Sequence, residues 1–99
     1  MENEDFGAYI RHLREDKNLP LRKVAEQLDI DTSTLSKVER GDRPISIEYL
    51  KLLSEILSVN LKEIQVRYIT SKVHRDLGQL EFVSEGLIEA EKQIKKAKK

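Results

Sequence analysis

The chain has 99 residues, 38% of them hydrophobic and 36% charged, and its 18 basic and 18 acidic side chains cancel; this length suits one small domain with at most an appended element. The absence of cysteine excludes disulfides, cysteine-ligated zinc and thiol chemistry. Only two prolines and four glycines interrupt the chain, so we expect an all-α protein. No apolar run reaches membrane-spanning length, and the first residues are acidic, unlike a signal peptide. We therefore expect the protein to be located in the cytoplasm.

The first predicted helix runs from about Phe6 to Lys17. Its apolar side chains recur at helical spacing on one face; they are Phe6, Ile10 and Leu13. Either Asp5 or Asn3 can cap the first turn, since a short acidic or amide side chain accepts a hydrogen bond from the free N–H groups there. We expect this helix to end near Asn18.

Two short helices joined by a tight turn are predicted next, over Leu21–Leu28 and Thr32–Arg40. The apolar positions are Leu21, Val24, Ala25 and Leu28 in the first helix and Leu35 and Val38 in the second. The segment Asp29–Asp31 interrupts the pattern, because Asp favours turns and caps, and Asp31 is the expected N-cap of the second helix. Gly41 follows that helix as a residue suited to the left-handed conformation.

The second helix of this pair presents short polar side chains to solvent. Its outward-facing residues are Thr32, Ser33, Ser36, Lys37 and Arg40. An ordinary αα-hairpin would show the same apolar periodicity, but solvent exposure alone does not favour such poor helix formers. Small side chains allow close approach to base edges, and the short turn fixes a large angle between the helices. The pattern therefore favours a helix-turn-helix that binds DNA.

The middle of the chain is predicted to contain two more helices. A helix over Ile47–Leu57, capped by Ser46, has the widest apolar face of the first 60 residues, with Ile47 on that face. Asn60 and Glu63 then form the polar part of a capping box that opens a helix from Leu61 to about Leu77.

A last helix is predicted after Gly78, so that the C-terminal third forms a helical hairpin. Its apolar surface exceeds what one small domain can cover, and a homodimer interface is the natural use. The predicted interface residues are Ile69, Val73, Leu77, Leu80, Val83, Leu87 and Ile94. The lysines of the tail, 92 to 99, are interpreted as favourable charge at a helix C-terminus rather than as a phosphate contact.

The string LRKVAEQLDIDTSTLSKVERG, preceded by IRHLR and followed by RP, resembles the Cro/repressor (XRE-type) helix-turn-helix family of bacterial and phage regulators. The resemblance covers about residues 6 to 66 and implies a five-helix, lambda-repressor-like DNA-binding domain over residues 1–66, followed by a dimerisation extension over 67–99. The chain is also similar in length and layout to small controllers of restriction–modification operons. Pro20 departs from the family, which often has a capping Ser or Thr there.

The resemblance also assigns roles to individual residues. Base edges would be read by Thr32, Ser33 and Lys37, with Ser36 between them. Arg40 and Arg43 leave the end of the recognition helix and are assigned to phosphates, as are the backbone N–H groups of Leu21 and Arg22 and the nearby Lys23. In the family, the residue matching Arg14 pairs with the glutamate matching Glu39, and an anion near a helix C-terminus needs such a cation.

The net charge limits the expected affinity for DNA. Residues 1 to 60 contain nine Lys and Arg against twelve Asp and Glu, whereas residues 61 to 99 contain nine against six. Phosphate binding depends on local charge, and Glu2 and Glu4 lie outside the basic cluster around the motif. We therefore expect modest nonspecific affinity and a requirement for a dimer.

The sequence thus predicts a homodimeric, sequence-specific transcriptional regulator that binds double-stranded DNA at a palindromic operator. One alternative is an antitoxin-like protein whose C-terminal helices bind a partner protein; another is a helical dimerisation module without DNA binding. No phosphate-binding glycine loop, metal-ligand cluster or nucleophile pair is present, so we expect no enzyme, no cofactor and no metal.

Overall fold

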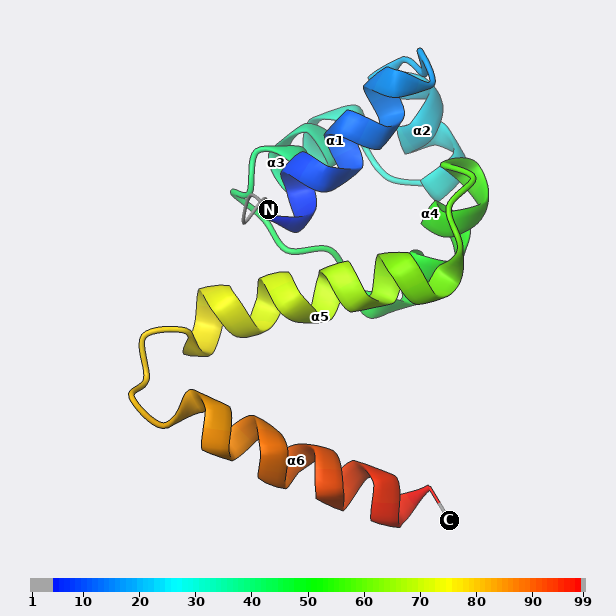
Figure 1. Ribbon diagram of the computed structural model, residues 1–99. Helices are drawn as coiled ribbons and strands as arrows, with labels where there is room; N and C mark the ends of the chain where they lie inside the picture. The colour runs from blue at the N-terminus through cyan, green and yellow to red at the C-terminus, as the bar shows by residue number, and fades with distance from the viewer. Residues whose placement is uncertain (1–4, 99) are drawn as a thin grey trace.

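The computed structural model describes residues 5–98, and within this range every regular element is helical (Figure 1). The elements in chain order are α1 (Phe6–Asp16), α2 (Leu21–Leu28), α3 (Thr32–Glu39), a 3-10 turn η1 (Ile47–Tyr49), α4 (Leu50–Ile56), α5 (Leu61–Leu77) and α6 (Val83–Ala97). The expected all-α fold is confirmed. The suggested cap Asn3 and the acidic residues Glu2 and Glu4 lie outside the described residues, as does Lys99 of the tail.

One hydrophobic core joins α1 to α4 with the first half of α5. Its members come from the apolar stripes of these helices, so that each helix buries one face. The large side chains with almost no exposed surface are Ile10, Val24, Leu35, Leu53, Leu57 and Ile64. Because stripes from five helices meet in this core, α2 and α3 are held at a fixed angle to one another.

Four helices end on a residue in the left-handed conformation. Asn18, Asp29, Gly41 and Ser58 have φ values of 56°, 58°, 80° and 55°. After each of them the next residue donates its N–H to a carbonyl five residues earlier, as Asp42 does to Lys37 at 2.9 Å. The predicted role of Gly41 is confirmed, and α1 ends next to Asn18 as expected.

The start of the fourth predicted helix differs from expectation. The segment Ile47–Tyr49 forms a 3-10 turn, and Ile47 is 68% exposed, so its predicted place on the buried face is wrong. Ile45, two residues earlier, enters the core instead and is 7% exposed. Because Ile45 fills this part of the core from the loop before the N-cap Ser46, the 3-10 turn begins outside the core and Ile47 stays in solvent.

The predicted N-caps differ in what their side chains do. The Asn60 side chain accepts from the N–H of Glu63 at 2.8 Å, as expected, and Asp5 accepts from Ala8 at 2.9 Å. Asp31 and Ser46 occupy cap positions, but their side chains make no capping hydrogen bond.

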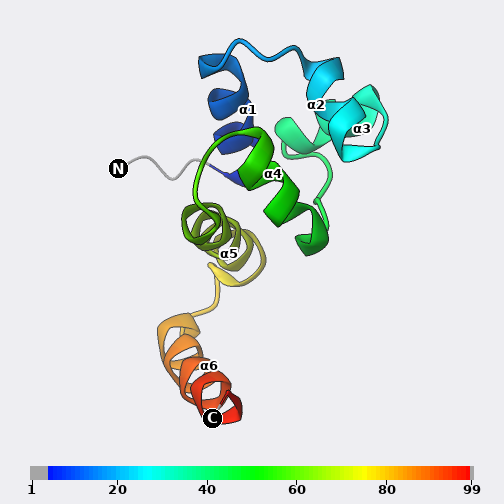
Figure 2. The same cartoon turned by 90° about the vertical axis from the view of Figure 1, so that its right-hand side faces the viewer.

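Helix α5 belongs to the core in its first half and extends beyond it in its second half. The Tyr68 hydroxyl donates to the Ile45 carbonyl at 2.9 Å, and the N–H of Phe6 donates to the Ser71 hydroxyl at 3.0 Å. The predicted boundary at residue 66 therefore falls inside one continuous helix that still contacts α1 at Ser71. Beyond a bend after Leu77, α6 returns as the second arm of an open hairpin that diverges from α5 (Figures 1 and 2).

Candidate DNA-binding surface

Helices α2 and α3 form a compact helix-turn-helix on the side of the core away from α6 (Figure 2). Val24, Ala25 and Leu28 of α2 are buried, as are Leu35 and Val38 of α3. Asp29 reverses the chain with its positive φ of 58°, and the half-buried Ile30 packs against the core behind the turn. The turn is therefore fixed on both sides, and α3 cannot rotate about its axis without exposing Leu35.

The outer face of α3 contains the residues predicted to read bases. Thr32, Ser33 and Lys37 are exposed to solvent, whereas Ser36 is half-buried. These four side chains occupy the side of the helix opposite Leu35 and Val38. An exposed face of hydroxyl groups with one ammonium group can donate to and accept from base edges in a major groove.

A buried ion pair fixes the C-terminal end of α3 to α1. The Arg14 Nε donates to one Glu39 carboxylate oxygen at 2.7 Å and Nη2 to the other at 3.0 Å, while Nη1 donates to the Leu19 carbonyl at 2.8 Å. The two side chains are only 12% and 5% exposed. The hydrogen bonds to Glu39 raise the pKa of Arg14 further above its ordinary value. The structure thus brings together the pair that the family resemblance implied.

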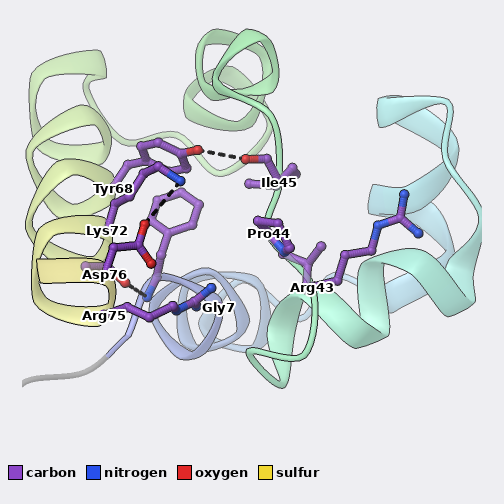
Figure 3. A pocket seen from close by; sticks show the side chains of 11 residues that line it. Gly7, Arg43, Pro44, Ile45, Tyr68, Lys72, Arg75 and Asp76 are labelled. Carbon is purple, nitrogen blue, oxygen red and sulfur yellow. Dashed lines mark hydrogen bonds and ion pairs between the residues drawn. The ribbon is translucent and has the colours of Figure 1, made fainter.

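The cations near the end of α3 differ in their surroundings. Arg40, the C-cap of α3, donates to the Asp42 carboxylate at 3.1 Å, and both side chains are more than half exposed. Arg43 is exposed and extends away from Tyr68 and Lys72 (Figure 3). A phosphate at this end of the helix would therefore meet Arg43 directly but would compete with Asp42 for Arg40.

The start of α2 provides the other predicted phosphate contacts. Arg22 and Lys23 are exposed, and Leu21 is half-buried. Pro20 takes the N-cap position and offers no side-chain cap, so no capping side chain competes for the N–H groups of Leu21 and Arg22. Free N–H groups at a helix N-terminus favour an anion.

Two supporting contacts are not evident from the sequence pattern. Gly7 lies where α1 crosses the end of α3, and a Cβ there would collide with the carbonyl oxygen of Val38 and lie 2.9 Å from that of Glu39. On the other side of α1, the Tyr9 hydroxyl donates to a Glu63 carboxylate oxygen at 2.6 Å. Burial, reinforced by Glu63, raises the pKa of Tyr9 to about 12. A glycine at a helix–helix crossing gives no signal in apolar periodicity, and neither does a contact between distant residues.

A small cavity lies beside this crossing, between α1, α5 and the loop after α3 (Figure 3). Its volume is about 40 Å³, and its walls include Phe6, Pro44, Tyr68 and Ser71. A space of this size holds one or two water molecules and is far smaller than a cofactor site. Within residues 5–98 no group of His, Asp or Glu side chains is arranged to hold a metal ion.

The predicted interface residues lie in the second half of α5 and in α6. Ile69, Leu77, Leu80, Leu87 and Ile94 are between 41% and 59% exposed. Val73 and Val83 are half-buried. None of the helices in the described part of the chain is long and apolar enough to span a membrane.

Comparison with known proteins gives a consistent assignment. A helix-turn-helix family profile matches residues 10–64. Control protein C.BamHI of Bacillus amyloliquefaciens is 32% identical over 60 residues, which are 60% of this chain and 74% of that protein. The transcriptional activator BcrR of Enterococcus faecalis is 35% identical over 60 residues, 61% of this chain and 29% of that protein. The transcriptional regulator PrpR of Mycobacterium tuberculosis is 39% identical over 49 residues, half of this chain and 10% of that protein.

The chain thus spans well under half the length of PrpR and BcrR. No solved structure shows a significant match. The matched residues 10–64 include α2, α3 and Glu39 with its partner Arg14. The chain belongs to the XRE-type helix-turn-helix family, a family of DNA-binding transcriptional regulators and not of enzymes.

Proposed function

We propose that this protein is a sequence-specific transcriptional regulator that binds a palindromic operator as a homodimer. The observation that carries the proposal is the exposed polar face of α3, held rigid from behind by the Arg14–Glu39 pair. A recognition helix needs such rigid support, because base-edge hydrogen bonds depend on placement of the side chains.

In this proposal Lys37 donates to guanine O6 or N7, while the Thr32 and Ser33 hydroxyls serve as donors or acceptors and the Thr32 methyl meets a thymine methyl. The half-buried Ser36 sits between them at the groove edge. Phosphate contacts come from Arg40 and Arg43 after α3 and, at the start of α2, from three residues. These three are Leu21 and Arg22 through backbone N–H groups and Lys23 through its side chain.

The homodimer would form through the apolar side chains of α5 and α6 that the monomer leaves exposed. A two-fold axis would place the two α3 helices about 34 Å apart, so that they meet successive major grooves of one DNA face. Repression by covering a promoter is the simplest mechanism. The similarity to a protein named as a control protein supports a small autonomous regulator, such as a controller of a restriction–modification operon.

The test is selection of bound sites from random duplex DNA with the wild-type chain and with Lys37→Ala. The matched control is Lys62→Ala, since Lys62 is an exposed lysine at the start of α5, away from α3. We expect a palindromic motif that loses definition at one position per half-site in Lys37→Ala and is unchanged in Lys62→Ala. Weak, salt-sensitive binding without any motif would contradict the proposal and favour the alternative in which the C-terminal helices bind a partner protein.

A further inference from the structure

Helix α6 leaves the body of the molecule with its apolar side uncovered. None of its residues is buried, and Leu87 and Ile94 are 42% and 55% exposed. Apolar and small residues recur along one face of the helix at alternating steps of four and three, which is the spacing of a two-helix interface. These residues, here called the α6 stripe, are Val83, Leu87, Ala90, Ile94 and Ala97.

The stripe alternates in size along the helix. Leu87 and Ile94 occupy one of the two heptad positions, and the smaller Val83, Ala90 and Ala97 occupy the other. Two parallel copies would set Ala90 against Ala90 and leave a void, because equivalent positions meet in a parallel pair. Two antiparallel copies set each large residue against a small one, Leu87 against Ala90 and Ile94 against Val83, which fills the interface evenly.

The charged residues along α6 also favour the antiparallel arrangement. Residues 81 to 91 contain four glutamates and no Lys or Arg, whereas residues 92 to 99 contain five lysines and no Asp or Glu. A parallel pair would place acid beside acid and base beside base. An antiparallel pair in the register of the stripe places Glu81 of each chain level with Lys96 of the other, and such complementarity selects partner and orientation.

We infer that α6 pairs in antiparallel orientation with α6 of a second copy of this chain. The inference rests on the homodimer of the proposed function and specifies its contact. In the register set by the stripe, Ala97 of the partner's helix comes opposite Leu80, beside an apolar groove of about 460 Å³ at the bend between α5 and α6. That groove, lined by Leu77, Leu80, Phe82 and Leu87, receives the end of the partner's helix.

Introduced cysteines test the orientation, since the chain has none of its own. Val83→Cys and Ile94→Cys are prepared separately, then oxidised alone and as a mixture. In the antiparallel register each position lies about 17 Å along the axis from its own copy, too far for a disulfide, but faces the other position. We expect a covalent dimer in the mixture and none from either variant alone. Self-cross-linking of both variants, or no cross-linking in any sample, would overturn the inference.

Charge reversal gives a second readout that does not depend on disulfide formation. Changing Lys95, Lys96 and Lys98 to Glu puts these acidic side chains near Glu81 of the partner helix. We expect the dissociation constant of the dimer to rise about tenfold. Reversing Glu81 to Lys as well should lower the dissociation constant again, because this glutamate is level with the changed lysines in the proposed register. The control is Glu85→Lys with Lys92→Glu, two positions on the side of α6 opposite the stripe, which should leave the constant unchanged. An unchanged constant in the triple variant would contradict the antiparallel pair.

Sedimentation equilibrium and site selection on the same preparations separate this inference from the proposed function. A dimer that selects a palindrome but fails both α6 tests overturns the α6 contact and leaves the proposed regulator intact. A monomer that selects no palindrome overturns both.

Discussion

Replacing Arg14 by Met should destabilise the protein more than any change on the surface of α1. The guanidinium makes two hydrogen bonds to Glu39 and one to the Leu19 carbonyl, and the side chains of the pair are 12% and 5% exposed. Met keeps an unbranched apolar stem in place of the arginine stem, so the change removes the guanidinium with its charge and hydrogen bonds.

The expected loss of unfolding free energy in Arg14→Met follows from the carboxylate that the change leaves unpaired. The Glu39 carboxylate stays buried at the C-terminus of α3, where the helix dipole disfavours an anion, and it has lost its counter-charge. Breaking one side of a buried ion pair costs about 3–5 kcal/mol. For a domain of this size a loss of about 3 kcal/mol lowers the melting temperature by roughly 12–24 °C.

Urea unfolding followed by circular dichroism at 222 nm measures the free energy of unfolding of each variant. Arg11→Met is the matched control, because Arg11 pairs with Glu15 on the same helix at 3.0 Å but the two side chains are 56% and 48% exposed. That exposed pair should contribute little to stability, because solvent screens it. If Arg14→Met and Arg11→Met lose similar amounts, below about 1 kcal/mol, the Arg14–Glu39 pair does not anchor α3 and the reasoning is refuted.

Three further predictions test other contacts. Gly7→Ala should lower the free energy of unfolding by about 2 kcal/mol, because the added Cβ meets backbone carbonyls of α3. The control Gly86→Ala should not destabilise the protein, because nothing lies within 4 Å of a Cβ there. Equal effects of the two changes in urea unfolding would contradict this prediction. The raised pKa of Tyr9, about 12 against 10.0, means that the folded state holds this proton more tightly, so stability should fall between about pH 10 and 12. A pH titration followed by absorbance at 295 nm should show one tyrosine that ionises at a higher pH than the others, and this transition should be absent in Tyr9→Phe. Asp42→Asn should release Arg40 and tighten DNA binding several-fold at low salt, measured by fluorescence anisotropy; no change would show that Arg40 does not bind phosphate.

Local pattern was sufficient for most of the helices. The stripe in α2, the cap at Asn60 and the left-handed Gly41 each depend on residues within one or two turns of each other. The length of α5 also follows from local spacing. The pattern is less informative at Asp29 and Ser58, which take the left-handed conformation without being glycine, because any short polar residue can do so when the flanking helices are held in place.

Contacts between distant residues needed the folded chain. The family resemblance implied the Arg14–Glu39 pair, but the burial of this pair arises only when α1 and α3 cross. The exposure of Ile47 has the same kind of origin, since the loop before it sends Ile45 into the core in its place.

The sequence by itself determined that the chain is all-helical, that α2 and α3 form a helix-turn-helix and that α3 has an outer polar face, because each of these depends on periodicity and on capping over a few residues. Only the tertiary structure decided how closely α1 can approach α3 at Gly7, that Arg40 pairs with Asp42, and that α6 stands away from the core. These features depend on the packing of segments far apart in the chain, and packing is set by the shape and charge of all the partners together.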